Sequence, residues 1–551
     1  MSLVLTSLCR TESTVCRHPT AFTRAFSSNT SKKRFRSSSH QETKQFRWKL
    51  AAAASGAVVG MVTYNYIQNK PDLTFLRKPV QAKSDPVYSS ADVAQHADKQ
   101  SGIWVTYQDS VYDITGFVES HPGGEKILMG AGGPIDAFWN MYAVHKTPEV
   151  LQILEQYRIG KLSRRDQKAI NLNDPFANEP FRLPVLRINS QKPFNAEPPL
   201  EVLTDSFITP NELFYVRNHL PVPDFDLENF KLEVLVGGRK LALSVDEIKK
   251  KYKPVTITTT IQCAGNRRQE MSQYQNVKGL TWGACAIGTA RWTGVRLRDI
   301  LLDAGFDLND NRFKHIQFNG NDKDITKSSY GGSIPKHKAM SIDGDVIIAY
   351  KMNGVDIPRD HGYPLRVIVP GYVGARNVKW LHQVVASDEE SSSHWQRNDY
   401  KVFSPSTTFE TADYKKAQSI QEMPVISAIS TPAEGSKVES DDGVIEVKGY
   451  AWSGGGRDII RVDVSADGGK TWKEANLVKD KPGADDSTHS WAWSLWNAEV
   501  EVTPGKKNEI VCKAIDSAYN CQPEFIGPIW NLRGFLTNAW HRISVEVEDD
   551  E

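Results

Sequence analysis

The stretch TTTIQCAGNRR, residues 258–268, gives the first indication of the fold in the middle of the chain. Its threonines and isoleucine form a β-branched run that predicts a buried strand, and Ala-Gly-Asn predicts the loop that ends it. Cys263 therefore stands at a strand end, with Arg267 and Arg268 close behind. Their fixed positive charges favour the thiolate, the form of cysteine that binds metals and attacks electrophiles. The alternative for a lone cysteine is a buried structural thiol beside surface arginines.

The composition fits a large globular protein with several domains. The chain has 551 residues, of which 40% are hydrophobic, enough for more than one core. The formal net charge is +1, but residues 1–83 hold 14 Lys/Arg and only 3 Asp/Glu, so the remainder is acidic. An acidic body argues against nucleic acid as a partner and permits a basic protein partner. The sequence shows no P-loop and no glycine-rich dinucleotide fingerprint, so neither nucleoside triphosphate nor nicotinamide is indicated.

The first 83 residues predict a mitochondrial transit and sorting segment. Residues 1–48 are rich in Arg, Ser and Thr, and their only acidic residues are Glu12 and Glu42. The uncharged run at residues 50–69 is about long enough to cross a bilayer but is weakly hydrophobic. We expect a stop-transfer signal that leaves the mature chain in the intermembrane space without a stable membrane span. A permanent anchor or a disordered tail is the alternative.

Changes of pattern divide the rest of the chain into three domains and a linker, a multidomain α+β fold. Residues 84–162 are aromatic-rich with several helical patterns, and residues 163–180 are polar without apolar periodicity, which predicts a flexible linker. Residues 181–423 combine short strands, Gly/Pro turns and few long helices, as in a mixed α/β domain. Residues 424–545 show short alternating strands, which are typical of an immunoglobulin-like β-sandwich.

The other cysteines give no sign of a disulfide framework. Cys512 and Cys521 could pair if the compartment allowed it. Cys285 lacks the flanking motif of Cys263 and is interpreted as structural.

Two histidines in the first domain form a candidate haem site. His121 precedes Pro-Gly-Gly, a turn that can direct an imidazole into a cleft, and His145 lies 24 residues further on. Two neutral imidazoles across a pocket are the axial ligands of a six-coordinate haem iron, which passes electrons rather than binding oxygen. The expected apolar walls are Phe117, Leu128, Phe138 and Trp139. The segment resembles cytochrome b5, including its Tyr-Asp-Ile-Thr-Gly-Phe and His-Pro-Gly-Gly motifs, and its acidity could steer it onto a basic redox partner.

Loops rich in Arg, His, Lys and Gly recur through the central domain. Such loops suit an anionic cofactor and an anionic substrate, although singly most would be turns or surface salt bridges. They lie at residues 214–219, 329–335, 359–366 and 371–380. Together with the motif Cys-Ala-Gly-Asn-Arg-Arg they resemble the sulfite oxidase family over residues 85–545, in the domain order of the animal enzymes.

The resemblance implies a molybdenum–molybdopterin centre and answers why Cys263 is placed as it is. Cys263 would be the one protein thiolate on the metal, a soft ligand that leaves other positions open for oxygen transfer. The residues expected to hold the pterin are Phe214, Tyr215, Val216, Arg217, Asn218, Asp322, His361, Arg366, Asn377, Val378 and Lys379. Those expected around the substrate are Arg217, Arg268, Tyr330 and Arg533, with Trp282 in the wall of the pocket.

The resemblance also implies the reaction, which is oxidation of sulfite to sulfate in the breakdown of sulfur amino acids. Electrons would pass singly to the b-type haem and on to cytochrome c. Arginines keep their charge at working pH and can hold a doubly charged anion. The sandwich resembles the family's dimerisation domain, which implies a two-fold homodimer. Arg533 could instead tie the sandwich to the central domain through a salt bridge.

Two other functions are alternatives. Assimilatory nitrate reductases share the molybdenum and sandwich domains, but they carry the cytochrome unit after them, add a flavin domain, and have methionine where this chain has Arg533. A non-enzymatic haem carrier with a degenerate central domain is the second alternative. The intact set of Cys263, Arg217, Arg268, Tyr330 and Arg533 argues against it.

Overall fold

The computed structural model describes residues 85–122, 127–128, 130–141, 143–170, 174–324, 326–480, 483 and 485–548. The targeting segment predicted over residues 1–83, including the apolar run at 50–69, lies outside the described residues. No helix in the described ranges is both long and apolar enough to span a bilayer.

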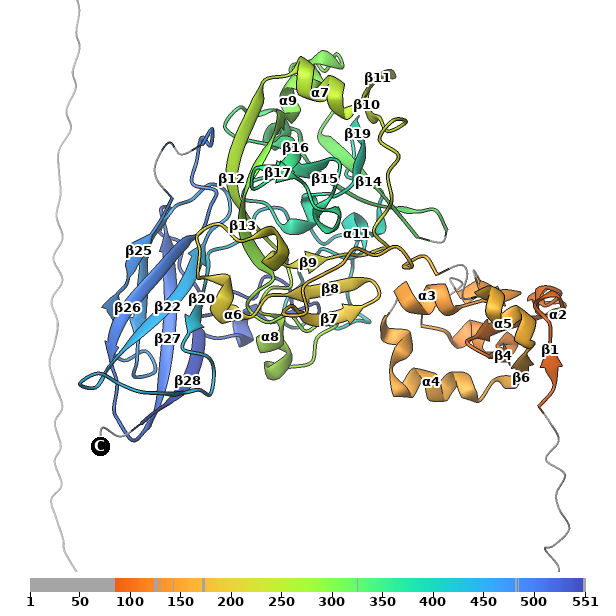
Figure 1. Ribbon diagram of the computed structural model, residues 1–551, viewed down its shortest axis with the longest axis horizontal. Helices are drawn as coiled ribbons and strands as arrows, with labels where there is room; N and C mark the ends of the chain where they lie inside the picture. The colour runs from red at the N-terminus through yellow and green to blue at the C-terminus, as the bar shows by residue number, and fades with distance from the viewer. Residues whose placement is uncertain are drawn as a thin grey trace, which may run out of the picture. The chain divides into compact units, whose positions relative to one another are not determined.

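The N-terminal domain is a small mixed sheet with short helices packed around it (Figure 1). The strands follow the order β1-β6-β4-β3-β2, and β5 pairs with β3. Its strands are β1 Val87–Tyr88, β2 Ala97–Asp98, β3 Gly102–Tyr107, β4 Ser110–Asp113, β5 Gly133–Pro134 and β6 Arg158–Leu162. Its helices are α2 Ser90–Ala94, η2 Thr115–Ser120, α3 Asp136–Met141, η4 Ala143–Lys146 and α4 Pro148–Glu155. Side chains alternate between the two faces of β3, and Ile103 and Val105 on one face are buried in the core of this domain.

The linker predicted over 163–180 is not irregular throughout. Helix α5, Arg164–Ile170, occupies its first part. Phe176 is buried in the core of the central domain, so the second part is packed down. A polar stretch can still form a short helix, and a single aromatic side chain can anchor a segment without any periodicity. The flexibility of this linker stays a prediction. Residues 171–173 lie outside the described ranges.

The central domain contains three sheets. Their strand orders are β7-β8-β9, β11-β10-β19-β14-β15 and β12-β13-β16-β17, with β18 beside β16. The strands are β7 Arg187–Gln191, β8 Phe194–Glu197, β9 Val216–Arg217, β10 Leu232–Val236, β11 Arg239–Leu243, β12 Pro254–Gln262, β13 Ile287–Arg296, β14 His315–Lys323, β15 Ser329–Pro335, β16 Ile347–Met352, β17 Val355–Asp356, β18 Arg366–Ile368 and β19 Leu381–Ser387. The helices are α6 Leu200–Leu203, η6 Asn211–Leu213, α7 Val245–Lys251, α8 Arg268–Tyr274, α9 Leu297–Asp303, α10 Lys336–Met340, η7 Arg359–His361, η8 Gly374–Arg376 and α11 His394–Arg397.

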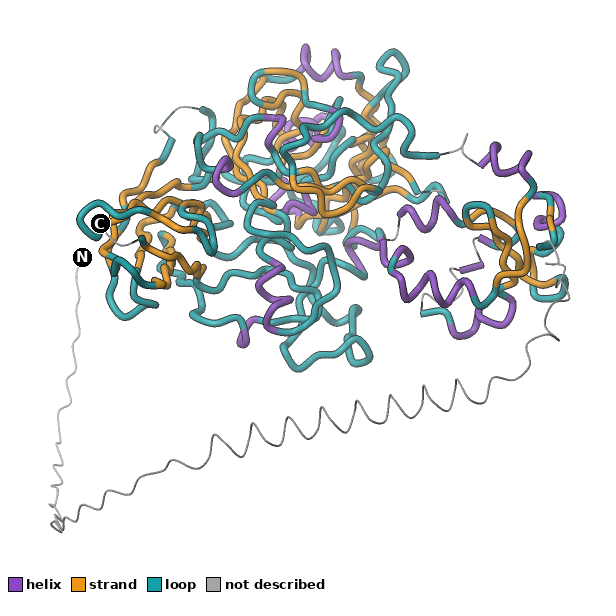
Figure 2. Tube along the Cα trace, turned by 60° about the horizontal axis from the view of Figure 1, so that its bottom comes forward, coloured by secondary structure: helices purple, strands orange, loops and turns teal. Residues whose placement is uncertain are grey.

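The C-terminal domain is a sandwich of two sheets, and Figure 2 shows that it is built almost wholly of strands and loops. The sheets have the orders β20-β22-β26-β25 and β21-β28-β27-β23-β24. The elements are β20 Ile426–Thr431, β21 Lys437–Val438, β22 Val444–Trp452, β23 Ile459–Ser465, β24 Lys473–Glu474, β25 Asn476–Val478, β26 Ser494–Glu501, β27 Lys507–Asp516, η9 Gly527–Ile529 and β28 His541–Val547. Cys512 is buried and Cys521 is exposed, and both are free thiols.

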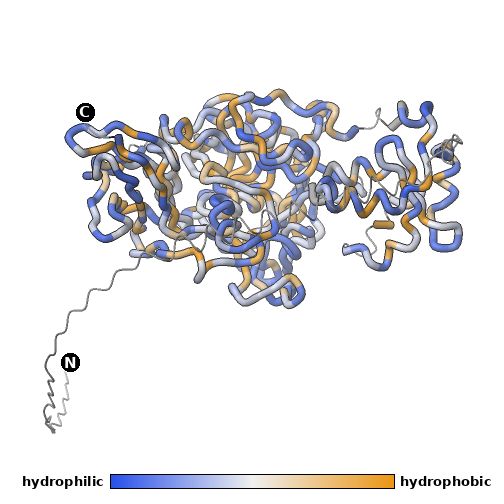
Figure 3. Tube along the Cα trace, turned by 90° about the horizontal axis from the view of Figure 1, so that it is seen from below, coloured by the Kyte–Doolittle hydropathy of each residue, from blue (hydrophilic) through white to orange (hydrophobic). Residues whose placement is uncertain are grey.

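The central domain and the sandwich share one apolar core. Ala264 and Ala284 of the central domain pack in the same cluster as Ile426, Tyr450 and Trp452 of the sandwich. Figure 3 shows hydrophobic positions gathered in the interior of this part of the chain. Ala264 directly follows Cys263, so the loop that carries the cysteine rests on the sandwich.

Candidate functional site

Cys263 directly follows β12, as the sequence predicted. All nine residues of β12 pair with β13, which fixes the strand up to Gln262. The amide of Cys263 then donates to the carbonyl of Ala286 at 2.9 Å. The amide of Gly265 donates to Cys263 Sγ at 3.4 Å, which holds the sulfur in place at the start of the loop. Cys263 is thus a presented thiol at a rigid strand end, with its sulfur lining a pocket.

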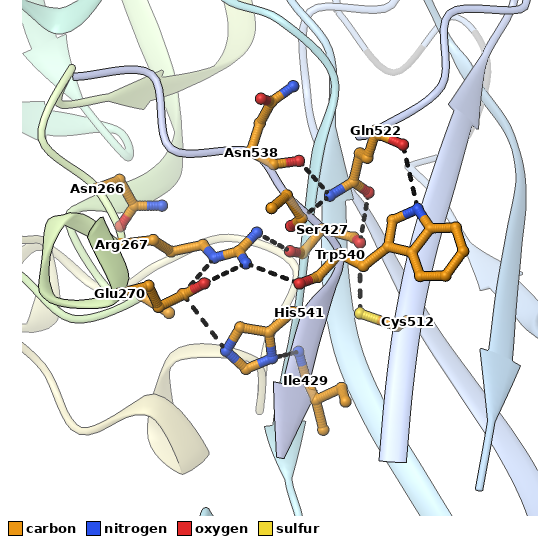
Figure 4. Close-up of polar contacts among 12 residues, drawn as sticks. Asn266, Arg267, Glu270, Ser427, Ile429, Cys512, Gln522, Asn538, Trp540 and His541 are labelled. Atoms are coloured by element: carbon orange, nitrogen blue, oxygen red, sulfur yellow. Dashed lines mark hydrogen bonds and ion pairs between the residues drawn. The ribbon is translucent and has the colours of Figure 1, made fainter. Parts of the chain in front are cut away.

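Arg267 holds this loop against the sandwich (Figure 4). Its φ of +62° lies in the left-handed region, which residues other than glycine rarely adopt. Its guanidinium is fully buried and binds both carboxylate oxygens of Glu270 at 2.6 Å. It also donates to the carbonyl of Ser427 at 3.0 Å and to that of Trp540 at 3.4 Å. The residue four places after the cysteine is therefore fixed by the other domain.

The pocket beside Cys263 has about 630 Å³ of space free of protein atoms, counted to its open mouth. Its lining residues are Phe214, Tyr215, Arg217, His219, Ile261, Cys263, Asp322, Tyr330, His361, Arg366, Gly374, Ala375, Asn377, Lys379, Trp380 and Tyr400. The structure thus brings together residues that are up to 186 positions apart, from Phe214 to Tyr400.

Three basic side chains give part of the pocket an anion-binding character. Lys379 Nζ donates to the carbonyl of Asp360 at 2.7 Å and to the side chain of Asn218. Burial lowers the pKa of Lys379 to about 7 and that of Arg366 to about 10. His361 donates from Nε2 to the carbonyl of Asn211 at 2.9 Å, and burial lowers its pKa to about 4, so it is neutral at pH 7. A bound phosphate would stabilise the charged forms of Lys379 and Arg366.

Polar atoms left without partners show that the pocket fits a pterin cofactor. The Nε atom of Arg366 and the Oδ1 atom of Asp322 are buried and have no hydrogen-bond partner among the residues that the structure describes. A guanidinium N–H suits a phosphate oxygen, and a carboxylate suits the N–H groups of a pterin. Burial raises the pKa of Asp322 to about 7, and N–H donors would lower it again. With Cys263 as thiolate, the donor set fits molybdenum–molybdopterin.

A second group of side chains gathers around Arg217. Its Nη1 donates to Asn195 at 3.1 Å and to the carbonyl of Asn218 at 2.6 Å, which orient the guanidinium. The hydroxyl of Tyr400 and Nε2 of His219 form a hydrogen bond of 2.7 Å. Burial, followed by the charge of Arg217, lowers the pKa of His219, so the ring is neutral at pH 7. No local motif in the sequence marks Tyr400, and His219 lies in the candidate loop at residues 214–219 without a predicted role of its own.

Arg268 and Arg533 are not among the residues that line the pocket. Arg268 donates from Nε to the carbonyl of Arg533 at 3.0 Å and from Nη1 to that of Leu280 at 2.8 Å. Burial, together with Arg533 and Arg217, lowers its pKa to about 10, while Cys263 opposes this shift. Arg533 forms an ion pair with Asp399, the contact that the sequence analysis gave as its alternative role.

Several predicted residues pack in cores or bind neighbouring groups of the chain, namely Val216, Asn218, Trp282, Tyr330, Asn377 and Val378. Of these, only Tyr330 and Asn377 line the pocket. Val216 and Val378 pack in apolar cores, and Trp282 is fully buried against the ring of Tyr215. The side chain of Asn218 binds Lys379 and Asp360, and that of Asn377 binds the backbone at Val369 and Val373. Tyr330 lines the pocket, but its hydroxyl donates to the carbonyl of Ala375 at 2.8 Å.

The two histidines of the N-terminal domain face each other. Their ring centroids are 6.2 Å apart and their planes differ by 5°. This spacing leaves room for one metal ion between a nitrogen of each ring, since metal–imidazole bonds are about 2 Å long. The predicted walls are in place, with Trp139 stacked on His145 at 5.3 Å and Phe117 edge-on to His121 at 5.9 Å. The pair fits a haem iron.

Three family models match the chain in the order of its domains. A "Cytochrome b5-like Heme/Steroid binding domain" matches residues 89–163. An "Oxidoreductase molybdopterin binding domain" matches residues 219–395. A "Mo-co oxidoreductase dimerisation domain" matches residues 417–548. These matches confirm the predicted fold classes of the three domains.

Curated relatives match this chain over most of its length. The "Sulfite oxidase" of Gallus gallus is 52% identical over 466 residues, covering 84% of this chain and 100% of that protein. The "Sulfite oxidase, mitochondrial" of Homo sapiens is 51% identical over 471 residues, covering 84% of this chain and 85% of that protein. Among solved structures, the sulfane dehydrogenase SoxCD of Paracoccus pantotrophus matches with a TM-score of 0.53 and 23% identity, covering 67% of this chain and 87% of that one. The last likeness shows the fold alone.

Proposed function

The chain belongs to the sulfite oxidase family, and on that premise we propose how its own residues carry out the reaction. It is an oxidoreductase that acts on sulfite, with molybdenum–molybdopterin and a b-type haem as cofactors. The predictions of the family, the reaction and both cofactors are confirmed. The nitrate reductase and haem carrier alternatives are set aside, since relatives at about half identity act on sulfite and the molybdopterin domain is intact.

Cys263 is proposed as the protein ligand of molybdenum, and Lys379, Arg366, His361 and Asp322 as the residues that hold the pterin. The observation that carries this assignment is the pocket that Cys263, Arg366 and Asp322 line together, with a buried polar atom of Arg366 and of Asp322 left without a partner among the described residues. When bound, the centre supplies an oxygen atom to sulfite and takes up two electrons, which the haem then accepts singly. The chain's part is to fix the ligand, bind the anion and exclude water.

The proposed anion site lies on the arginine side of the pocket. Arg217, Arg268 and Arg533 supply fixed positive charge to a dianion. Tyr400 supplies a hydroxyl next to Arg217, and its partner His219 is neutral at pH 7, so it orients that hydroxyl without adding charge. His121 and His145 are proposed to hold the haem iron.

The chain is a mitochondrial protein and forms a homodimer through its sandwich. We propose that it works in the intermembrane space and that cytochrome c accepts its electrons. The N-terminal segment of 1–83, with a basic part and then an apolar run, supports the first proposal. The acidic N-terminal domain supports the second, since a basic redox partner would be steered to it.

Cys263→Ser tests the central assignment. Serine is a hard and mostly protonated ligand, so the variant should keep its fold and haem spectrum but lose sulfite-driven haem reduction. Cys285→Ser is the matched control, a buried cysteine of the same domain whose amide binds Glu197 and whose sulfur lies outside the pocket lining. Near-normal sulfite turnover by Cys263→Ser would overturn the assignment.

A further inference from the structure

The side chain of Arg268 passes through a slot formed by three glycines. A Cβ atom added at Gly265 would lie 2.6 Å from Nη2 and 2.7 Å from Cζ of Arg268. One added at Gly279 would lie 2.6 Å from the same Cζ, and one at Gly534 would lie 2.6 Å from Cγ. Real Cβ atoms essentially never come within 3.0 Å of a heavy atom outside their own residue and its chain neighbours. No side chain larger than hydrogen therefore fits at these positions while Arg268 keeps its place.

The guanidinium of Arg268 in this slot is a buried cation without a carboxylate counter-ion among the described residues. The two hydrogen bonds of Arg268 go to backbone carbonyls, those of Arg533 and Leu280. Within the described residues no carboxylate lies within 4.0 Å of its guanidinium nitrogens, in contrast to Arg267 and Arg533. Its position is thus set by backbone and by missing side chains rather than by a counter-ion. Such a group can pair with an incoming anion without first breaking an ion pair.

We propose that Gly265 and Gly279 are positioning residues for sulfite, because the absence of their side chains holds the guanidinium of Arg268 where the anion binds. The proposal rests on the proposed role of Arg268 in binding sulfite. Gly265 has a double part in it, since its amide also donates to Cys263 Sγ. One glycine therefore sets both the sulfur ligand and the substrate cation.

Gly265→Ala changes the position of the Arg268 guanidinium but keeps the hydrogen bond to Cys263 Sγ. The φ angle of Gly265 is outside the left-handed region, so alanine is allowed there, and the amide that binds Cys263 Sγ is kept. The atoms that its methyl group would meet are the far end of a flexible side chain. The protein can relieve the clash with the methyl group by moving the guanidinium, and it need not unfold. The expected change is therefore in anion affinity.

The test compares Gly265→Ala, Arg268→Lys and the double variant in the full-length enzyme with both cofactors. Gly265→Ala should raise the KM for sulfite about ten- to a hundredfold, the loss of one charge-assisted hydrogen bond, with kcat changed less than about threefold. The Kd of sulfate, measured by calorimetry, should weaken by a similar factor, and metal and haem contents should not change. The double variant should have nearly the KM of Arg268→Lys alone, because the methyl group acts through the missing guanidinium.

Two further variants complete the design. Gly279→Ala reaches the same guanidinium from another segment and should reproduce the rise in KM. Gly354→Ala is the control for a strained glycine site, since it has φ +85° and no atom within 4 Å of the added Cβ, and its KM should be unchanged.

Each contrary result has one meaning. If the effects of Gly265→Ala and Arg268→Lys on KM multiply in the double variant, the slot proposal is wrong. An unchanged KM and sulfate affinity in Gly265→Ala, or a fall in kcat alone, also overturns it. If Arg268→Lys itself leaves the KM unchanged, the proposed role of Arg268 as a sulfite ligand fails instead.

Discussion

Arg533 of the sandwich forms an ion pair with Asp399, the residue that immediately precedes Tyr400 in the central domain. Both side chains are largely shielded, being 16% and 14% exposed, and Nε of Arg533 is buried without a partner. The pair brings a carboxylate close to the arginines proposed to bind the anion. Nη2 of Arg533 therefore pairs with a carboxylate of the central domain, while its Nε–H remains a donor without an acceptor in the part of the chain that the structure describes.

Arg533→Met and Asp399→Asn distinguish the two roles of Arg533. If Arg533 binds sulfite, Arg533→Met raises the KM for sulfite by about one to two decades while Asp399→Asn does not raise it. Steady-state kinetics with sulfite checks this, alongside the molybdenum content and the dimer mass. Equal losses of thermal stability in the two variants with unchanged KM would assign Arg533 to the ion pair alone.

Tyr400→Phe should impair sulfite oxidation more than Tyr330→Phe does. The hydroxyl of Tyr400 lies beside Arg217 and binds neutral His219, so its loss removes a donor to the anion, worth about one decade or more in kcat/KM. The hydroxyl of Tyr330 is bound to a backbone carbonyl, and its loss should cost about 1 kcal/mol of stability with little change in KM. Equal kinetic effects would contradict this ranking.

His121→Ala or His145→Ala should abolish the low-spin haem spectrum and leave molybdenum bound. The histidines face each other within the N-terminal domain, whereas the pterin residues belong to the central domain. Sulfite oxidation should persist with a small one-electron oxidant such as ferricyanide and stop with cytochrome c. Metal analysis and two parallel activity assays check this. Loss of molybdenum together with haem would show that the domains do not act independently.

His541→Gln should make the protein less sensitive to acid. Burial, followed by the charge of Arg267, lowers the pKa of His541 from 6.5 to about 4. Between these values the unfolded chain binds a proton that the folded protein does not, so the free energy of unfolding falls as pH falls from 6.5 to 4. The full effect is about 3 kcal/mol at most. Urea unfolding at pH 7 and pH 4.5 measures the slope, and an equal slope in the variant would refute the prediction.

The sequence predicted what depends on local pattern. The strand ending at Cys263, the two facing histidines and the sandwich all follow from β-branched runs, a turn motif and alternation. It could not identify Tyr400 or Asp399, because their importance arises only when loops far apart in the sequence converge. It marked the loop that holds His219 but gave that residue no role. It also expected Val216 and Val378 to hold the pterin, and the side chains of both pack in apolar cores.

The hydrogen bonds of the Arg267 guanidinium predict that the C-terminal sandwich cannot be removed without loss of the site. A gene cut after residue 423 would encode every residue that lines the pocket, yet it would remove Arg533 and the carbonyls of Ser427 and Trp540 that receive the Arg267 guanidinium. The Arg267–Glu270 pair would then face water on one side, and its left-handed backbone would lose the contacts that enforce it. The sandwich is consequently part of the smallest catalytic unit. A sandwich domain exchanged for this one must place backbone carbonyl groups where those of Ser427 and Trp540 lie.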